Sequence, residues 1–212
     1  AQMHKGRNQL QDLAQVEQAL LMMGTSAFFN QIPPSPIVED LLSPHLARLM
    51  DLLKLIVRAH RASRYAAEFA AHLMDLHAEE VRVAALLHDL SEMLMWCFAS
   101  DKMSEIAKLQ HADSTLRSKA AQEQVLGFKI TDLQNELIQV FQLPPLLAQL
   151  MEDESSESQR VKNVRIAVNL ARHSANGWDN AALPDDYRDV ASLLHVDVDR
   201  AMHIIGVPKA GG

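Results

Sequence analysis

The chain has 212 residues, of which 48% are hydrophobic and 22% are charged, and its formal net charge is −7. These proportions are typical of a globular protein, and the length suffices for one sizeable domain or two small ones. The acidic charge gives no sign of the basic surface that nucleic-acid-binding domains usually carry, so we expect no nucleic-acid partner. The single cysteine, Cys97, excludes a disulfide framework and favours a reducing, cytoplasmic setting.

No segment predicts insertion into a membrane. The N-terminal AQMHKGRNQ lacks the apolar core of a signal peptide, and the longest apolar run, residues 93–99, is far too short to span a bilayer. Because the chain begins with Ala, we expect it to be a fragment of a longer protein. Residues 1–9 are expected to form a poorly ordered start.

Short helices and a loop are expected next. Hydrophobic residues recur every three to four positions up to Gly24, which is a suitable C-terminal cap: Leu10, Leu13, Val16, Leu20 and Met23. Thr25 or Ser26 can cap a second short helix that runs through Phe29. Three prolines at positions 33, 34 and 36 then predict a loop.

A long helical segment follows Ser43-Pro44, a cap followed by proline at the first helical position. Neither Gly nor Pro interrupts it before about residue 76, so it is either one very long helix or two joined by a slight break. Four cations fall roughly on one face: Lys54, Arg58, Arg61 and Arg64. They indicate either a site for phosphate or an acidic partner, or a solvated helix face, which is the commoner meaning of a charge run.

Residues 81–99, VRVAALLHDLSEMLMWCFA, predict a single helix that is buried on all sides, because the stretch is apolar almost throughout and holds neither Gly nor Pro. His88 and Asp89 form one adjacent polar pair in its middle. Neighbouring helical positions point about 100° apart, so both side chains can reach a common point beside the helix. A carboxylate among apolar residues requires a partner or a cation.

The remaining chain also reads as helices, over residues 101–112, 115–126, 131 to before 143, 161–177, 185–194 and 197–205. Pro144 or Pro145 is expected to open a further short helix, and residues 152–158, EDESSES, predict a solvated acidic connector. Alternating strand patterns and a repeat of fixed period are absent from the sequence. The predicted fold is all-α, a multi-helix bundle.

The segment from Ala84 to Leu90, AALLHDL, resembles the signature helix of the HD superfamily of metal-dependent phosphohydrolases. The layout around it resembles the HDOD domain, the HD-related output domain of bacterial signalling proteins. Three further segments carry this resemblance: Gln18–Gly24, Glu123–Phe128 followed by Leu137, Phe141, Leu143 and Pro144, and Val164–Ala171. It implies one HD-like helical domain over residues 10–212 that lacks the family's first helical lobe.

The resemblance also implies a divalent metal site at His88 and Asp89, because active HD enzymes bind metal through this pair and further His and Asp residues, and the metal activates water. In this sequence, however, the other ligand positions correspond to Ala62, Ile130, Ser155 and Arg172. The metal site is therefore expected to be vestigial, with no cofactor. A working enzyme would need a new ligand set, for instance His88, Asp89 and Glu154 with His60 or His111.

Two hypotheses of different classes follow. In the first, the chain is a non-catalytic helical output or interaction domain that binds a protein partner or itself, with surfaces near Arg58 and Arg61 or near Met22 and Met23. In the second, it is a divergent metal-dependent phosphohydrolase that acts on a nucleotide or cyclic dinucleotide. A domain that binds a nucleotide without turnover is a third, weaker hypothesis.

Overall fold

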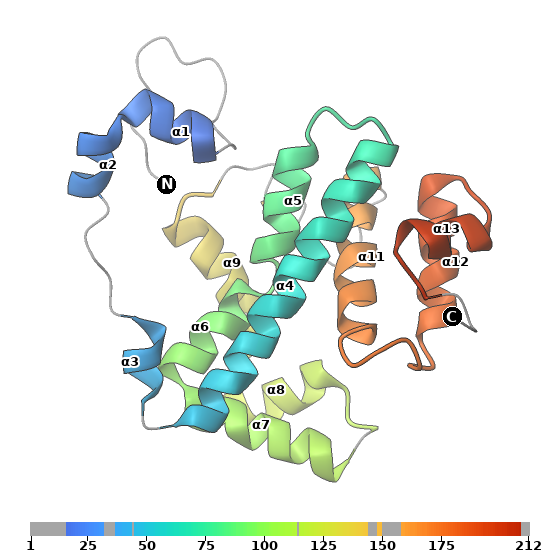
Figure 1. Ribbon diagram of the computed structural model, residues 1–212. Coiled ribbons are helices and arrows are strands. Elements are labelled where there is room, and N and C mark those ends of the chain that lie inside the picture. Colours follow the sequence, from blue (N-terminus) through green and yellow to red (C-terminus); the bar gives the residue numbers. More distant parts are fainter. Residues whose placement is uncertain are drawn as a thin grey trace. The chain divides into compact units, whose positions relative to one another are not determined.

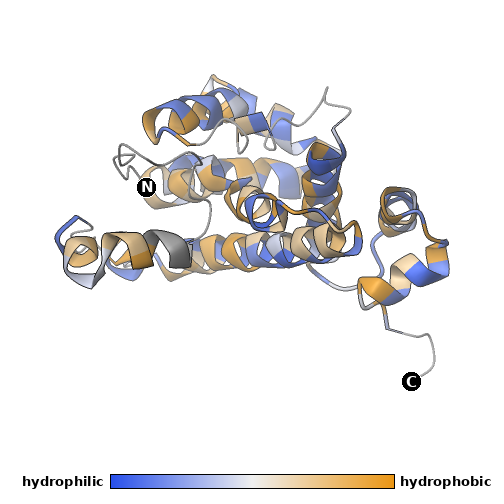
Figure 2. Cartoon of the chain, turned by 90° about the horizontal axis from the view of Figure 1, so that it is seen from above, coloured by the Kyte–Doolittle hydropathy of each residue, from blue (hydrophilic) through white to orange (hydrophobic). Residues whose placement is uncertain are grey.

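The structure is a computed structural model that describes residues 16–31, 37–43, 45–113, 115–143, 148–149 and 158–208. Every regular element in these ranges is a helix, which confirms the predicted all-α fold (Figure 1). Most of the helices have a hydrophobic and a hydrophilic side (Figure 2). None of the helices in the described part is long and apolar enough to cross a membrane.

The chain divides into two compact units, one formed from residues 1–56 and 89–144 and the other from residues 57–88 and 145–212. The first unit contains α1 (Val16–Met23), α2 (Thr25–Gln31), α3 (Val38–Leu42), α6 (Leu90–Phe98), α7 (Ser100–Ala112), α8 (Ser118–Leu126) and α9 (Ile130–Val140). The second contains α5 (Ala78–Leu87), α11 (Gln159–His173), α12 (Leu183–Leu194) and α13 (Val198–Ile204). Helix α4 (Leu46–His72) contributes residues to both.

The core of the second unit combines larger hydrophobic side chains with alanines, which recur on α4, α5 and α11. Alanines at positions 62, 66 and 70 of α4 lie in it with Ala84 and Ala85 of α5 and Ala167 and Ala171 of α11. Phe69 of α4 is fully buried and stacks on Tyr65, with 6.1 Å between the ring centroids. Burying one such aromatic side chain stabilises the fold by about 1.5–3 kcal/mol.

Polar ties between distant segments fix the second unit. The guanidinium of Arg160 on α11 donates two hydrogen bonds to the carboxylate of Asp75, at 2.8 and 2.9 Å. The amide of Asn163, which is buried, donates to the carbonyl of Ala66 at 3.1 Å. The Ser63 hydroxyl donates to the carbonyl of Arg82 at 3.0 Å. These bonds connect α11 and α5 to α4 and to the turn that follows it.

The first unit has its own core, to which the N-terminal part of α4 contributes. Leu52 and Leu55 of α4 are buried there with Leu42 of α3, Trp96 of α6 and Met103 of α7. Arg48 donates a 3.0 Å hydrogen bond to the Ser100 hydroxyl and also pairs with Asp101, so the start of α4 is tied to the start of α7. Helix α7 begins at Ser100, one residue before the predicted start at residue 101.

Several predicted boundaries agree with the structure. Helix α4 is one continuous helix rather than two. Gly24 and Gly127 follow α1 and α8 with φ of +75° and +77°, a left-handed conformation that glycine adopts without strain. Helix α8 begins at residue 118 rather than 115, and α11 ends at His173, before Gly177.

Other predictions lie outside the described residues. These are the poorly ordered start at residues 1–9, the beginning of the first helix, the proline loop at 33–36, the helix opened by Pro144 or Pro145, and the acidic connector apart from Ser158.

Replacing Asp75 by Asn should lower the free energy of unfolding by about 1–3 kcal/mol at neutral pH, because Arg160 loses its charged partner. Burial alone would raise the pKa of the Asp75 carboxyl, but hydrogen bonds from Arg160 and the His77 backbone amide, with the charge of Arg160, lower that pKa below its usual value. The stabilisation is therefore present above pH 4 or so and is lost as the pH falls through the lowered pKa. Urea unfolding followed by circular dichroism measures both effects.

The matched control is Asp185→Asn, which removes an exposed carboxylate that pairs with Arg188 in the same unit. Its effect should stay within about 0.5 kcal/mol. Equal losses for the two variants, or a difference from wild type that persists in acid, would contradict the role given to Asp75.

Candidate functional site

His88 and Asp89 lie in a turn between α5 and α6, so the prediction of one helix over residues 81–99 is wrong. His88 keeps helical dihedral angles at the end of α5, but Asp89 has φ −99° and ψ 25°, outside the helical region. Aspartate is unfavourable inside a helix because its carboxylate competes for nearby backbone groups. The break therefore falls at the residue where a helix is locally weakest.

The stretch is also less buried than predicted. Val81 and Trp96 lie in the two cores, but Phe98 is 75% exposed, and His88 and Asp89 are half-buried. Each of these two residues interacts with another group of the chain. The burial on all sides that the apolar sequence predicts does not occur, since only five residues between positions 81 and 99 are buried and most of the others are partly exposed.

The start of α6 is held by a residue that the sequence did not single out. The backbone amide of the buried Ser91 donates a hydrogen bond of 3.0 Å to the side-chain carbonyl of Gln134 on α9. A helix leaves its first amides without partners, and this bond satisfies one of them in the way that an N-cap side chain does. Asp89, the residue at the N-cap, makes no such side-chain bond.

The other proposed metal ligands lie on different helices or outside the described residues. His60 is exposed on α4, His111 is exposed on α7, and Glu154 is outside the described residues. In the ranges that the structure describes, no three His, Cys, Asp or Glu side chains are grouped so that they could hold one metal ion. His88 and Asp89 supply one imidazole and one carboxylate, so the described residues do not complete a metal site. The vestigial metal site remains a prediction.

Three of the four positions where the family resemblance implies further ligands lie in the described part of the chain. Ala62 is in the core of the second unit, and Ile130 is the first residue of α9. Arg172 is exposed near the end of α11, and Ser155 is outside the described residues. A histidine at position 62 would have to fit into a closely packed core, which usually costs about 1–3 kcal/mol.

The basic face predicted on α4 is only partly available to a ligand. Arg61 donates a 2.7 Å hydrogen bond to the carbonyl of Ser174, which follows the last turn of α11. A cation at a helix C-terminus interacts favourably with the helix dipole. Lys54 pairs with Asp51, and Arg64 is exposed. Arg61 thus has a structural role that neither interpretation of the charge run predicted.

A second residue pair that the sequence missed joins α11 and α12. His173 Nδ1 lies 2.7 Å from a carboxylate oxygen of Asp186, which is buried. Burial raises the pKa of the Asp186 carboxyl, although its hydrogen bond with His173 acts in the opposite direction. The local sequence contains no metal or catalytic motif around these two residues, so the pair could be found only from the fold.

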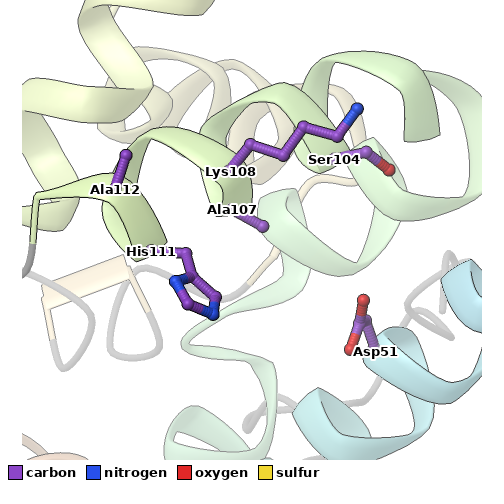
Figure 3. A pocket seen from close by; sticks show the side chains of 6 residues that line it. All are labelled: Asp51, Ser104, Ala107, Lys108, His111 and Ala112. Atoms are coloured by element: carbon purple, nitrogen blue, oxygen red, sulfur yellow. The ribbon is translucent and has the colours of Figure 1, made fainter.

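An open hollow of about 470 Å³ lies in the first unit between α4 and α7. Asp51 and His111 face it from the two helices, and Ser104 and Lys108 add a hydroxyl and a cation (Figure 3). Charges of both signs line it, so it does not favour an anion such as phosphate. Cys97 is not a reactive alternative, because burial raises the pKa of its thiol and disfavours the thiolate.

Comparison with known families decides the classification. The model of the HDOD domain matches residues 8–156, about 70% of the chain. The chain belongs to the HDOD family. The HDOD match contains the turn with His88 and Asp89 and ends before α11. The resemblance of Val164–Ala171 to the family therefore stays a prediction. The single domain over residues 10–212 also stays a prediction. No curated protein and no solved structure gave a significant match.

Replacing Gln134 by Ala should lower the free energy of unfolding by about 0.5–2 kcal/mol, because the Ser91 amide loses its partner at the start of α6. Gln139→Ala is the matched control: Gln139 is exposed on the same helix, and both changes raise helix propensity equally. Urea unfolding compares the two variants, and hydrogen exchange at the Ser91 amide should accelerate in Gln134→Ala alone. Unchanged exchange there would show that this bond does not hold α6.

Proposed function

We propose that this HDOD chain is a non-catalytic output or interaction domain of bacterial signal transduction, that it acts in the cytoplasm, and that it binds a protein partner or a second copy of itself. Membership of the HDOD family supports the signalling role. The observation that carries the non-catalytic part is the replacement of the family's ligands by Ala62, Ile130 and Arg172, none of which binds a metal as His or Asp does.

The surroundings of His88 and Asp89 are compatible with a structural role for the pair. They occupy the turn between two helices, and each already interacts with other groups of the chain. Polar groups away from water are normally satisfied within the protein, and removing one partner leaves the other at a cost of about 1–3 kcal/mol. The pair can therefore be retained for stability without any metal.

A metal-dependent phosphohydrolase is the second candidate, and the adjacent His88 and Asp89 favour it. A divalent cation bound there would activate water and neutralise phosphoryl charge, and His88 would supply an imidazole and Asp89 a carboxylate. This candidate requires at least one further ligand, for which Glu154 and the exposed His60 and His111 are the nominated residues.

Metal analysis and hydrolysis assays of the purified chain separate the two candidates. We expect fewer than about one Fe, Mn, Mg or Zn ion per ten chains after exposure to each metal, and no turnover of nucleotides or cyclic dinucleotides. Stoichiometric metal that is lost in Asp89→Asn, together with hydrolysis, would overturn the non-catalytic proposal. A thermal-shift screen with guanine nucleotides tests binding without turnover, since a ligand at 100 to 1,000 times its Kd stabilises by about 2.7–4.1 kcal/mol.

His88→Ala gives an independent test of the structural role. We expect its free energy of unfolding to fall by about 1–3 kcal/mol, because a partner within the protein is lost. His60→Ala is the control, since His60 is exposed on α4 and should have little effect. Full stability of His88→Ala combined with loss of a measurable activity would support the enzyme instead.

A further inference from the structure

Exposed hydrophobic side chains are concentrated in the N-terminal part of the first unit. Nine of the large hydrophobic residues that are exposed in the described part lie between residues 20 and 53: Leu20, Leu21, Met22, Phe29, Ile37, Leu41, Leu46, Met50 and Leu53. Single exposed hydrophobic residues are common, but a concentration of this kind marks an interaction surface. The nine residues form two groups on different helices.

The first group lies on the outer side of α4 and on α3. Leu46, Met50 and Leu53 are spaced by four and three residues, which places them along one side of α4. Leu52 and Leu55 on the same turns are buried in the core of the first unit. This part of α4 thus carries hydrophobic side chains on an exposed side as well as on its buried side, beside the exposed ion pair of Lys54 with Asp51. With Ile37 and Leu41, these exposed hydrophobic residues are called the α3–α4 face.

The second group lies on the pair of short helices α1 and α2 and consists of Leu20, Leu21, Met22 and Phe29, called the α1–α2 face. The two helices contact each other, and Phe28 packs edge-on against Phe29 with 5.3 Å between centroids. They have eight and seven residues, too short to be stable in water without packing, yet Leu21 is 84% exposed. Leu21, Met22 and Phe29 are each more than half exposed, so no part of the chain that the structure describes covers the α1–α2 face.

We propose that two copies of the chain form a two-fold symmetric dimer, in which the α1–α2 face of each copy covers the α3–α4 face of the other. In such a dimer the α1–α2 face of each copy contacts the α3–α4 face of the other copy. The contact is therefore made twice, the assembly closes, and neither face stays exposed. The proposal rests on the proposed function in one respect: it names a second copy as the partner of the interaction domain.

The exposed area supports a second copy as the occupant. At about 150–250 Å² for a large side chain, the nine exposed fractions amount to roughly 1,000 Å² per chain. A dimer with two equivalent contacts would bury roughly twice this area, and stable interfaces bury about 1,200–2,000 Å² in total. Helix α2 carries no charged residue, so it adds no ion pair to the contact.

Light scattering after gel filtration and analytical ultracentrifugation test the dimer with the full chain. We expect a dimer with Kd of about 10 µM or tighter, and an increase in Kd of at least about tenfold for Leu21→Glu and for Met50→Glu. Leu76→Glu is the matched control, because Leu76 is 97% exposed in the second unit and should leave Kd unchanged. Circular dichroism verifies that each variant keeps its helix content.

Mixing the two variants distinguishes the proposed exchange from other contacts. A heterodimer of Leu21→Glu with Met50→Glu has one contact with two altered faces and one contact that is fully intact, so the mixture should dimerise more tightly than either variant alone. An effect of Met50→Glu without an effect of Leu21→Glu would instead indicate α4 against α4 and would overturn the proposal. A wild-type chain that is monomeric at about 100 µM would also overturn it.

A pair of introduced cysteines tests whether the α1–α2 face of one copy covers the α3–α4 face of the other copy. With Cys97 replaced by Ala, Leu21→Cys in one chain and Met50→Cys in another should give a disulfide-linked heterodimer on mild oxidation. A chain that carries both cysteines and closes only on itself, without dimer, would show that α1 and α2 cover their own α4 and would overturn the proposal. These outcomes are independent of metal content and hydrolysis, so failure of the dimer leaves the non-catalytic proposal to its own assays.

Discussion

The second unit depends on alanines that allow three helices to approach one another closely. Ala62, Ala66 and Ala70 recur every four residues on α4, and α5 and α11 bring alanines to the same core. The approach is close enough for the side chain of Asn163 on α11 to donate a hydrogen bond to the backbone of α4 at Ala66. Any larger side chain on these faces would separate the helices, because protein interiors are packed as densely as organic crystals.

This packing bears on the prediction that the metal site is vestigial. The family resemblance implies a ligand at the position of Ala62, and that position now belongs to the alanine face of α4. Recovering the ligand would require more room in the core as well as a new imidazole. At the turn itself, His88 and Asp89 remain with interactions inside the chain. The residues that identify the family and those that would complete its chemistry are thus under different physical constraints.

The helices were predictable from sequence because their signals are local. The absence of Gly and Pro after Ser43-Pro44 predicted α4, hydrophobic residues predicted α11, and Gly24 and Gly127 predicted the ends of α1 and α8. The turn at His88 and Asp89 was missed because no Gly or Pro marks it, and because the bond from Gln134 that holds the start of α6 comes from a residue 43 positions away. Arg61 was misread for the same reason, since its partner Ser174 is 113 positions away. The family was identified correctly, whereas the role of the HD pair stays a prediction and its contacts depend on tertiary structure.

The discontinuity of the second unit has a consequence for biosynthesis. Its core combines α4 and α5 with α11, α12 and α13, and residues 89–144 belong to the other unit. While a ribosome adds those residues, Phe69, Val81 and the alanines of α4 and α5 are without the C-terminal helices that bury them. Such contacts between distant segments form late, and exposed apolar surface in the meantime is a target for chaperones. A chain cut at residue 156, where the family match ends, would keep these helices permanently uncovered.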